Sequence, residues 1–339
     1  MSATATNISE QLLQMISGIW VNRAIYVAAK LGIADLLKDG AKSVEELAAE
    51  TEVDTQSLYR VLRALASVGI FSEVERSFEL TPMAEYLRSD VPQSLRAMAI
   101  MFGGEEWHYQ PWANVLYSVK TGKPAFDKVF GMPAFPYLNQ NPEAAAIFDG
   151  AMTSFSAAHS AAIANGYDFA SIKTLVDVGG GHGSLLTGIL KTHPTLNGIV
   201  YDLPPVIAGA KLHLENDSIS DRCTTIAGDF FESVPSGGDA YMMKHIIHDW
   251  DDDRAIAILK NCYNAMPDNG KLLVIEHVIP DDNTPSPSQF LDLEMLVMTA
   301  GGRERTASEF QQLFAAAGFH LTQIVATKSP LCVIEGQKS

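Results

Sequence analysis

The chain has 339 residues, enough for two domains, and its composition of 47% hydrophobic and 19% charged residues is that of a globular protein. With 24 basic and 40 acidic residues the net charge is −16, and so acidic a surface repels nucleic-acid phosphates. No apolar run approaches the ~18 residues that span a bilayer, and residues 1–6 lack the basic start and apolar core of a signal peptide. We therefore expect a soluble, cytoplasmic protein that binds neither nucleic acid nor membrane.

A helical region is predicted from about residue 8 to residue 170, and it begins with a helix over Ile8 to Leu31. Apolar side chains of this segment lie on more than one helical face, so the helix needs more than one partner surface. A second subunit would provide such a surface, and so would an ordinary buried position within one domain. The pattern alone leaves both alternatives open.

Behind this helix the sequence predicts a winged-helix-like unit of two helices and a β-hairpin. Its elements are a helix opened by the capping box Ser43-Val44-Glu45-Glu46, a helix over Ser57–Leu65 that Gly69 ends, and strands over 70–73 and 77–81. Such units often bind DNA, and the recognition helix then carries several basic side chains. Here it offers Arg60 and Arg63 amid many acids, which favours a structural or dimerisation role over that of a transcription factor.

From about Ser171 the pattern changes to short apolar strands that alternate with helices. The strands are expected over 174–178, 198–202, 223–227, 240–243, 271–275, 321–326 and 331–335. The helices are expected after the first strand through Leu190, near 206–214 and 253–266, and from the capping box at Thr306 to Gly318. This alternation predicts an α/β fold, in which helices cover both faces of a parallel sheet.

The first of these strands runs into the glycine-rich loop Asp177-Val178-Gly179-Gly180-Gly181-His182-Gly183. Glycines in such a loop let the backbone approach a nucleotide-type ligand closely. The dinucleotide fingerprint G-x-G-x-x-G would need a glycine at Ser184, and the spacing here is G-x-G-x-G. We therefore expect the loop, with Asp177, Gly179 and Gly181, to hold the amino-acid end of S-adenosylmethionine.

Acidic residues also follow the next two strands. Asp202 ends one strand, where its carboxylate can accept hydrogen bonds from both ribose hydroxyls. Gly228-Asp229-Phe230 follows the other, where Asp229 can meet the adenine amino group and Phe230 can lie against the ring. Each acid alone could be a helix N-cap or a solvated turn. The glycine loop and both acids lie at the carboxyl ends of successive strands, which favours an S-adenosylmethionine site.

The segment Lys244-His245-Ile246-Ile247-His248-Asp249-Trp250 follows a strand and precedes a helix. A histidine beside an aspartate can be a metal ligand, a general base or a buried core residue. At this point the chain resembles the caffeic-acid/hydroxyindole type of small-molecule O-methyltransferases, which includes bacterial phenazine and polyketide-tailoring enzymes. The resemblance extends from about residue 10 to 336. It is carried by the motifs Leu175–Gly181, Tyr201-Asp202-Leu203-Pro204, Gly228–Phe231, His248-Asp249-Trp250, Pro267–Lys271, Gly301-Gly302-Arg303-Glu304-Arg305-Thr306 and Leu58–Arg63.

The resemblance implies a Rossmann-like methyltransferase domain with a seven-stranded sheet, preceded by a mainly helical, winged-helix-like dimerisation domain. The expected domains are 1–100 for dimerisation, 101–170 for a helical connector that contributes to the acceptor pocket, and 171–339 for cofactor binding and catalysis. It also implies a homodimer that uses S-adenosylmethionine, releases S-adenosylhomocysteine and needs no metal.

The family's catalytic residues carry over position by position. His248 would be the general base, Glu276 and Glu304 would flank it, and Asp249 follows it as in the family. Methyl transfer from a sulfonium is an in-line displacement that releases a neutral thioether, and an imidazole that removes the acceptor's proton contributes roughly 10²–10⁴-fold.

Further cofactor contacts are implied in the same way. Lys244 matches a lysine near the adenine, and Leu203 follows the ribose-binding acid in its motif. Phe230 stands where many relatives have methionine, and both side chains can pack on a purine.

The acceptor pocket is expected to include Met152, Phe155, Met295 and Thr299, because relatives bind a flat aromatic between apolar and methionine side chains. At helical spacing these residues also fit an ordinary core. Thr299 stands where plant phenylpropanoid enzymes often have asparagine, so their substrates are not assumed.

We expect methyl transfer to a phenol or enol hydroxyl of a small aromatic or polyketide-like metabolite. The alternative is an S-adenosylmethionine-binding tailoring protein that does not methylate, and the presence of His248, Glu276 and Glu304 argues against it.

Overall fold

A computed structural model describes residues 8–91, 93–216, 219–282 and 284–339. The chain divides into two compact units. The first comprises the described residues up to Tyr109 together with Glu143–Phe155, and the second comprises Gln110–Pro142 and Ser156–Ser339. The predicted boundaries at residues 100 and 170 remain a proposal, because the predicted connector contributes residues to both units.

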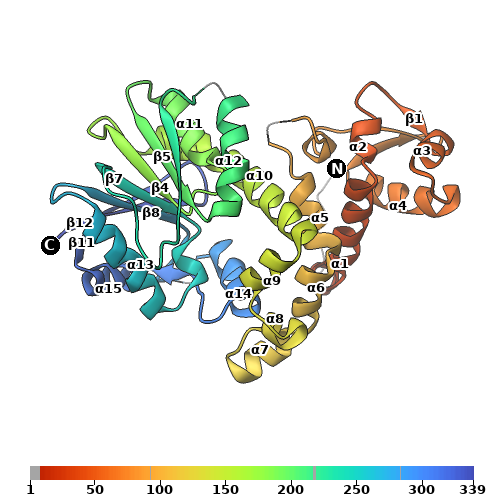
Figure 1. Ribbon diagram of the computed structural model, residues 1–339. Coiled ribbons are helices and arrows are strands. Elements are labelled where there is room, and N and C mark those ends of the chain that lie inside the picture. The colour runs from red at the N-terminus through yellow and green to blue at the C-terminus, as the bar shows by residue number, and fades with distance from the viewer. Residues whose placement is uncertain (1–7, 92, 217–218, 283) are drawn as a thin grey trace. The chain divides into compact units, whose positions relative to one another are not determined.

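The first unit is mainly helical and contains a small antiparallel sheet with strand order β1-β3-β2 (Figure 1). Its helices are α1 (Ile8–Lys30), α2 (Ile33–Leu36), α3 (Val44–Thr51), α4 (Thr55–Ser67), the 3₁₀ helix η1 (Ala84–Leu87) and α5 (Arg96–Gly104). The strands are β1 (Lys42–Ser43), β2 (Phe71–Val74) and β3 (Ser77–Leu80). The predicted hairpin is confirmed, as is the capping box, in which Ser43 and Glu46 exchange hydrogen bonds at the start of α3.

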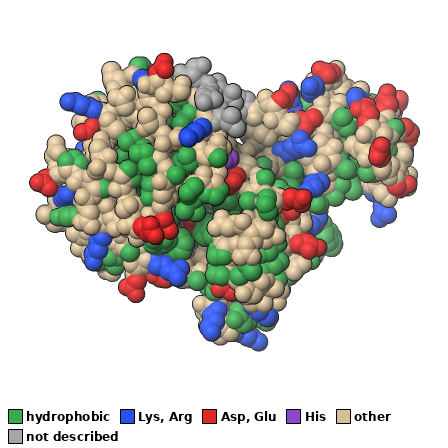
Figure 2. All heavy atoms as spheres, viewed as in Figure 1, with side chains coloured by type: hydrophobic (Ala, Val, Ile, Leu, Met, Phe, Trp, Pro, Cys, Tyr) green, Lys and Arg blue, Asp and Glu red, His purple; other side chains and the backbone are tan. Residues whose placement is uncertain are grey.

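Acidic side chains gather over α3 in this unit (Figure 2). Glu45, Glu46, Glu50 and Glu52 are all exposed there. On the neighbouring α4, Arg60 and Arg63 are exposed as well, and both belong to the helix that would read DNA in a winged-helix protein. An acidic face therefore lies next to these two arginines, and the absence of nucleic-acid binding stays a prediction.

Helix α1 corrects the expectation that no apolar segment is long enough to span a bilayer. Among the described residues it is long and apolar enough to cross a membrane by length and composition, because small residues link its apolar side chains into one window. It presents a broad apolar surface, with Leu12 58%, Ile16 68% and Trp20 75% exposed. Such a surface on a helix near the N-terminus needs a partner of its own.

Five helices connect the first unit to the main sheet. They are α6 (Glu106–Ala113), α7 (Val115–Thr121), α8 (Ala125–Phe130), α9 (Ala134–Gln140) and α10 (Pro142–Gly166). Trp107 and His108, which the sequence pattern could not place, lie buried on α6. The Trp107 ring meets Phe148 edge-on within the first unit.

The second unit is built on the predicted seven-stranded sheet, which has the order β11-β12-β8-β7-β4-β5-β6 (Figure 1). Its strands are β4 (Thr174–Val178), β5 (Asn197–Asp202), β6 (Cys223–Ala227), β7 (Ala240–Lys244), β8 (Lys271–Glu276), β11 (Phe319–Ala326) and β12 (Cys332–Lys338). Strand β12 runs antiparallel to both neighbours, and the pairs among β4 to β8 are parallel. The carboxyl ends of β4 to β8 therefore meet at one edge.

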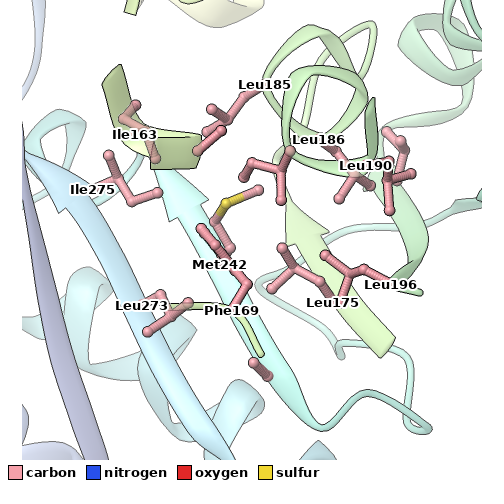
Figure 3. Close-up of a cluster of buried hydrophobic side chains, with 14 of the residues drawn as sticks. Ile163, Phe169, Leu175, Leu185, Leu186, Leu190, Leu196, Met242, Leu273 and Ile275 are labelled. Carbon is pink, nitrogen blue, oxygen red and sulfur yellow. The ribbon is translucent and has the colours of Figure 1, made fainter. Parts of the chain in front are cut away.

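Helices cover both faces of this sheet. The end of α10, α11 (Ser184–Thr192) and α12 (Pro204–Asn216) pack on one face around Leu186, Met242 and Leu273 (Figure 3). On the other face α13 (Asp252–Ala265) and α15 (Ala307–Ala317) pack around a second apolar cluster that includes Tyr241. This confirms the predicted α/β class.

Several short elements lie near the carboxyl edge and escaped prediction. They are the 3₁₀ turn η2 (Ile247–Asp249), the parallel pair β9 (Val278–Ile279) and β10 (Arg305–Thr306), and α14 (Ser288–Met298). Elements of two or three residues are too short to produce a periodic pattern. They matter here because η2 carries His248 and Asp249, and Glu304 lies directly before β10.

Candidate active site

The glycine loop after β4 adopts a backbone that only glycine takes without strain. Gly179, Gly181 and Gly183 have φ of +70°, +59° and +79°. The amide of Gly179 donates to the Tyr201 carbonyl at 2.8 Å, which ties the loop to the end of β5. The loop then leads into α11.

The space around the loop fits a ligand. A Cβ added at Gly179 would lie 2.5 Å from Ile246 Cδ1, so that side of the loop is packed against protein. A Cβ at Gly181 would meet nothing within 4 Å, so that side is open. The loop can therefore receive the amino-acid end of S-adenosylmethionine on the side of Gly181.

The next two acids lie where the sequence predicted them. Asp202 ends β5, its Oδ2 accepts from the Gly181 amide at 2.8 Å, and its Oδ1 accepts from Leu203 N at 2.7 Å. A carboxylate oxygen can accept more than one hydrogen bond. After β6, Gly228 N donates to the Asp202 carbonyl at 3.0 Å, and Asp229 Oδ1 accepts from the Phe231 amide at 2.8 Å.

Phe230 packs close to the glycine loop. Its Cε1 would lie 3.5 Å from a Cβ at Gly179, and its ring centroid lies 5.0 Å from that of Phe231. The structure thus brings Asp202, Asp229 and Phe230 together with the loop along one edge of the sheet.

Asp177 and Lys244 form a buried charged pair beneath this edge. Burial raises the pKa of Asp177 to about 7, although Lys244 lowers it, and Asp202 adds to the rise. Burial lowers the pKa of Lys244 to about 8 against the opposing effect of Asp177 and Glu276. Both pKa values thus lie near physiological pH, where a charged ligand can shift the protonation of either group.

His248 is the centre of a second cluster, at the carboxyl ends of β7 and β8. It lies in η2, where its side chain is buried. Its Nδ1 lies 2.6 Å from Glu304 Oε1, and its Nε2 lies 3.6 Å from Asp249 Oδ1. Glu304 is itself 2% exposed, and its amide donates to Asp292 Oδ1 at 2.9 Å.

Glu276 supports the backbone of the same segment. It ends β8 and is fully buried, and its Oε1 accepts from Ile246 N at 3.2 Å and from His248 N at 3.1 Å. The other carboxylate oxygens of Glu276 and Glu304 are buried and have no hydrogen-bond partner among the residues that the structure describes. A polar substrate group would satisfy them.

The carboxylates change the basicity of His248. Burial alone would lower its pKa, but Asp249, Glu304 and Glu276 together raise it to about 9. In turn, burial raises the pKa of Glu276 to about 7 and that of Asp249 to about 6, while His248 lowers both. The four side chains therefore form one electrostatic cluster around the imidazole.

Two further histidines surround the cluster, and sequence reasoning did not single them out. The His245 ring lies 4.8 Å from His248 and 5.6 Å from His277, measured between centroids. Burial keeps the pKa of both His245 and His277 below the usual value. His245 also has a positive φ of 54°, which is uncommon outside glycine.

The predicted acceptor residues fall in different units. Met152 and Phe155 lie on the α10 portion of the first unit and are half-buried. In the second unit, Met295 is buried on α14, and Thr299 Oγ1 donates back to the Met295 carbonyl at 2.9 Å. Their roles remain proposals.

No group of three or more histidine, cysteine or acidic side chains with the arrangement of a metal site occurs among residues 8–91, 93–216, 219–282 and 284–339. The predicted metal independence rests on the chemistry of the donor set, which is treated under the proposed function.

Comparison with known proteins decides the family. Residues 112–320 match the model of the O-methyltransferase domain, and residues 13–90 match that of the O-methyltransferase dimerisation domain. The chain belongs to this family of O-methyltransferases. It is therefore an S-adenosylmethionine-dependent enzyme, as the sequence predicted.

The relatives of this O-methyltransferase tailor small metabolites. The chain is 47% identical to the phenazine O-methyltransferase PhzM of Lysobacter antibioticus over 336 residues, which cover 99% of this chain and 98% of the relative. The crystal structure of LaPhzM matches with a TM-score of 0.95 at 46% identity, covering 98% of this chain and 100% of that one. NcsB1 from neocarzinostatin biosynthesis, in complex with S-adenosylmethionine and 2-hydroxy-5-methyl naphthoic acid, matches with a TM-score of 0.81 at 31% identity, covering 99% and 100%.

These matches support methylation of small aromatic and polyketide metabolites.

Proposed function

We propose that His248 is the general base of this enzyme and that its Nε2 takes the proton from a phenol or enol hydroxyl. The observation that carries the proposal is the hydrogen bond of 2.6 Å between Nδ1 and Glu304. It orients the imidazole with Nδ1–H toward Glu304, so that Nε2 is the proton acceptor whenever the ring is neutral.

S-adenosylmethionine supplies an electrophilic methyl group on sulfur. The acceptor oxygen attacks this carbon in line, the carbon–sulfur bond breaks, and the acceptor's proton passes to His248 Nε2. Because the sulfur leaves as a neutral thioether, the donor set needs no metal to stabilise it. Alignment of the acceptor and the sulfonium provides much of the remaining rate.

The raised pKa of His248 suits this step. A phenol has a pKa near ~10 and a free imidazole one near ~6.5, so proton transfer between them is uphill. A pKa of about 9 for His248 makes the transfer less unfavourable, and the neutral imidazole that accepts the proton predominates above about pH 9. The imidazolium that forms is stabilised by the buried Glu304, Asp249 and Glu276.

The cofactor would lie at the carboxyl ends of β4, β5 and β6. Gly179, Gly181 and Asp177 would hold its amino-acid end, and Asp202 with Leu203 would hold the ribose. Gly228, Asp229 and Phe230 would frame the adenine, with Lys244 beneath it. The open space at Gly181 and the position of Asp202 beside it, where its Oδ2 accepts from the Gly181 amide, support this arrangement.

The enzyme would work as a homodimer in the cytoplasm. The exposed apolar surface of α1, which lies largely within the matched dimerisation segment, supports a second copy as its partner. A monomer in light scattering at micromolar concentration would contradict this part of the proposal.

The test is turnover of a panel of small aromatics with isotopically labelled S-adenosylmethionine, read by mass spectrometry. Hydroxyphenazines, naphthols and catechols form one arm, and amine-bearing analogues without a hydroxyl form the other. We expect label on oxygen in the first arm. Label found in the amine arm alone would overturn the assignment of a hydroxyl acceptor.

A further inference from the structure

The motif Gly301–Thr306 contains a second charged residue next to Glu304. Arg305 is fully buried, a rare state for a guanidinium. Its Nη1 donates to the Ile247 carbonyl at 3.1 Å, and its Nη2 donates to the Trp250 carbonyl at 3.0 Å. These two carbonyls flank His248 and Asp249 on both sides.

The charge of Arg305 is paired at the same time. Its Nη2 and Nε donate to Asp252 Oδ1 at 2.8 and 3.2 Å. The Asp252 side chain is 52% exposed, so an ion pair by itself could form at the surface without burying the arginine. The feature that requires burial is the contact with the two carbonyls.

The turn is held from its amide side as well. Glu276 Oε1 accepts from the amides of Ile246 and His248, and the His248 carbonyl accepts from Arg303 N at 2.8 Å. Gly302 allows this approach, because a Cβ there would lie 2.6 Å from the His248 carbonyl oxygen. The Glu276 carboxylate thus holds amides of the turn, and the Arg305 guanidinium and the Arg303 amide hold its carbonyls.

We infer that Arg305 is a positioning residue for the base: it clamps the carbonyls on both sides of His248 and so keeps the imidazole in reach of Glu304. The positions of Arg305 and Glu304 are linked, because the two residues are neighbours in the chain. Arg305 pairs with Val278 in the short parallel sheet of β9 and β10, and this register fixes Glu304 one residue earlier. Arg305 acts through His248 and does not itself touch the reacting atoms.

Arginine is required for this role, since its planar fork spans several acceptors at once. A lysine would keep the positive charge but offers a single ammonium that cannot reach Ile247 O, Trp250 O and Asp252 together. With Arg305→Lys the turn loses part of its support, and the distance between His248 Nδ1 and Glu304 grows. Misplacement on the scale of 1 Å can cost about 10²-fold in rate.

The experiment compares Arg305→Lys with Arg222→Lys. Arg222 is a matched control, because it also donates to main-chain carbonyls, those of Leu196 and Leu190 at 2.8 and 3.0 Å, but supports no catalytic segment. For each variant we would measure kcat, its pH dependence, cofactor affinity by calorimetry, and Tm.

In Arg305→Lys we expect kcat to fall by about 10- to 100-fold, with cofactor affinity kept within about twofold. The midpoint of the pH profile of kcat should move to lower pH, since a displaced His248 loses the carboxylate that raises its pKa. Arg222→Lys should lower Tm and leave both kcat and the pH midpoint unchanged. A purely structural role for Arg305 would give the Arg222 pattern and would overturn the inference.

Gly302→Ala keeps the test decisive if Arg305→Lys does not fold. Its Cβ would meet Thr299 Oγ1 at 2.1 Å as well as the His248 carbonyl oxygen at 2.6 Å, so it is made together with Thr299→Ala and compared with Thr299→Ala alone. Relative to that control we expect the same loss of kcat and the same downward pH shift. An unchanged midpoint in the double variant would count against the clamp. The inference rests on His248 as the base, which His248→Gln tests separately: if that variant loses turnover while Arg305→Lys does not, only the clamp is wrong.

Discussion

In the second unit, two neighbouring parts of the sheet's carboxyl edge differ in backbone conformation and in burial. After β4 lie glycines with positive φ, and at the ends of β5 and β6 lie the partly exposed acids Asp202 and Asp229. At the ends of β7 and β8 lie His248, Glu276 and Glu304, all nearly or fully buried. The first part depends on the conformational freedom of glycine, and the second depends on the burial of ionisable side chains.

The difference shows how one fold separates binding from catalysis. A cofactor must enter and leave, so its loop uses main-chain amides and an open face. A base must have a shifted pKa, which needs charges held together away from water. Substitutions in the two regions should therefore affect different kinetic constants, and the predictions below use this.

The largest effect is expected for the base itself. His248→Gln removes the proton acceptor but no contact with the glycine loop, so kcat should fall by about 10²- to 10⁴-fold. Cofactor affinity measured by calorimetry should stay near that of the wild type. Near-normal turnover would remove His248 from the role of base.

A smaller effect is expected for Glu304→Gln. The amide keeps an oxygen for His248 Nδ1 but removes the negative charge, so kcat should fall by about 10- to 100-fold. Because Glu304 raises the pKa of His248, the midpoint of the pH profile should move to lower pH.

Glu335→Gln is the matched control for Glu304→Gln. Glu335 is also buried and accepts from Thr322 and Gln323, at 2.7 and 3.0 Å, but its contacts do not include the base turn. It should change Tm without moving the pH midpoint. Equal pH profiles in the two variants would contradict the assigned role of Glu304.

The smallest effect on kcat is expected in the cofactor loop. Gly181→Ala strains a φ of +59° by roughly 1–2 kcal/mol and places a Cβ in the open space beside the loop. The Kd of S-adenosylmethionine should rise about tenfold or more, while kcat at saturation changes little.

Gly131→Ala is the control that separates the effect of backbone strain from the effect of a Cβ in the space proposed for the cofactor. Gly131 has a similar φ of +73° and equally open surroundings, but it caps α8. It should lower stability and leave cofactor affinity unchanged. If both variants weaken binding equally, the open side of Gly181 is not where the cofactor lies.

The sequence predicted the sheet and the positions of the glycine loop and the acids at its edge, because these depend on local patterns; their part in cofactor binding stays a proposal. The periodicity of apolar residues, the spacing of the glycines and the acids after successive strands pointed to Gly179, Asp202 and Asp229 before the structure was known. The catalytic residues were different. His248, Glu276 and Glu304 lie on three segments, and only the resemblance to a family brought them together.

What escaped prediction lies in short elements and long-range contacts. The approach of Arg305 to the carbonyls of Ile247 and Trp250 depends on the placement of β10, a strand of two residues. Nothing periodic marks such a strand. The burial of Arg305 is likewise a tertiary property, and its sequence signal was membership of the Gly301–Thr306 motif.

The central claim is that buried carboxylates make His248 a stronger base than ordinary histidine. Nitrogen-15 NMR titration of histidine-labelled protein measures this directly, with the His248→Gln spectrum assigning the signal. The account predicts that the imidazole absent from that variant titrates well above the ordinary ~6.5, near 9. A titration at or below ~6.5 would contradict it.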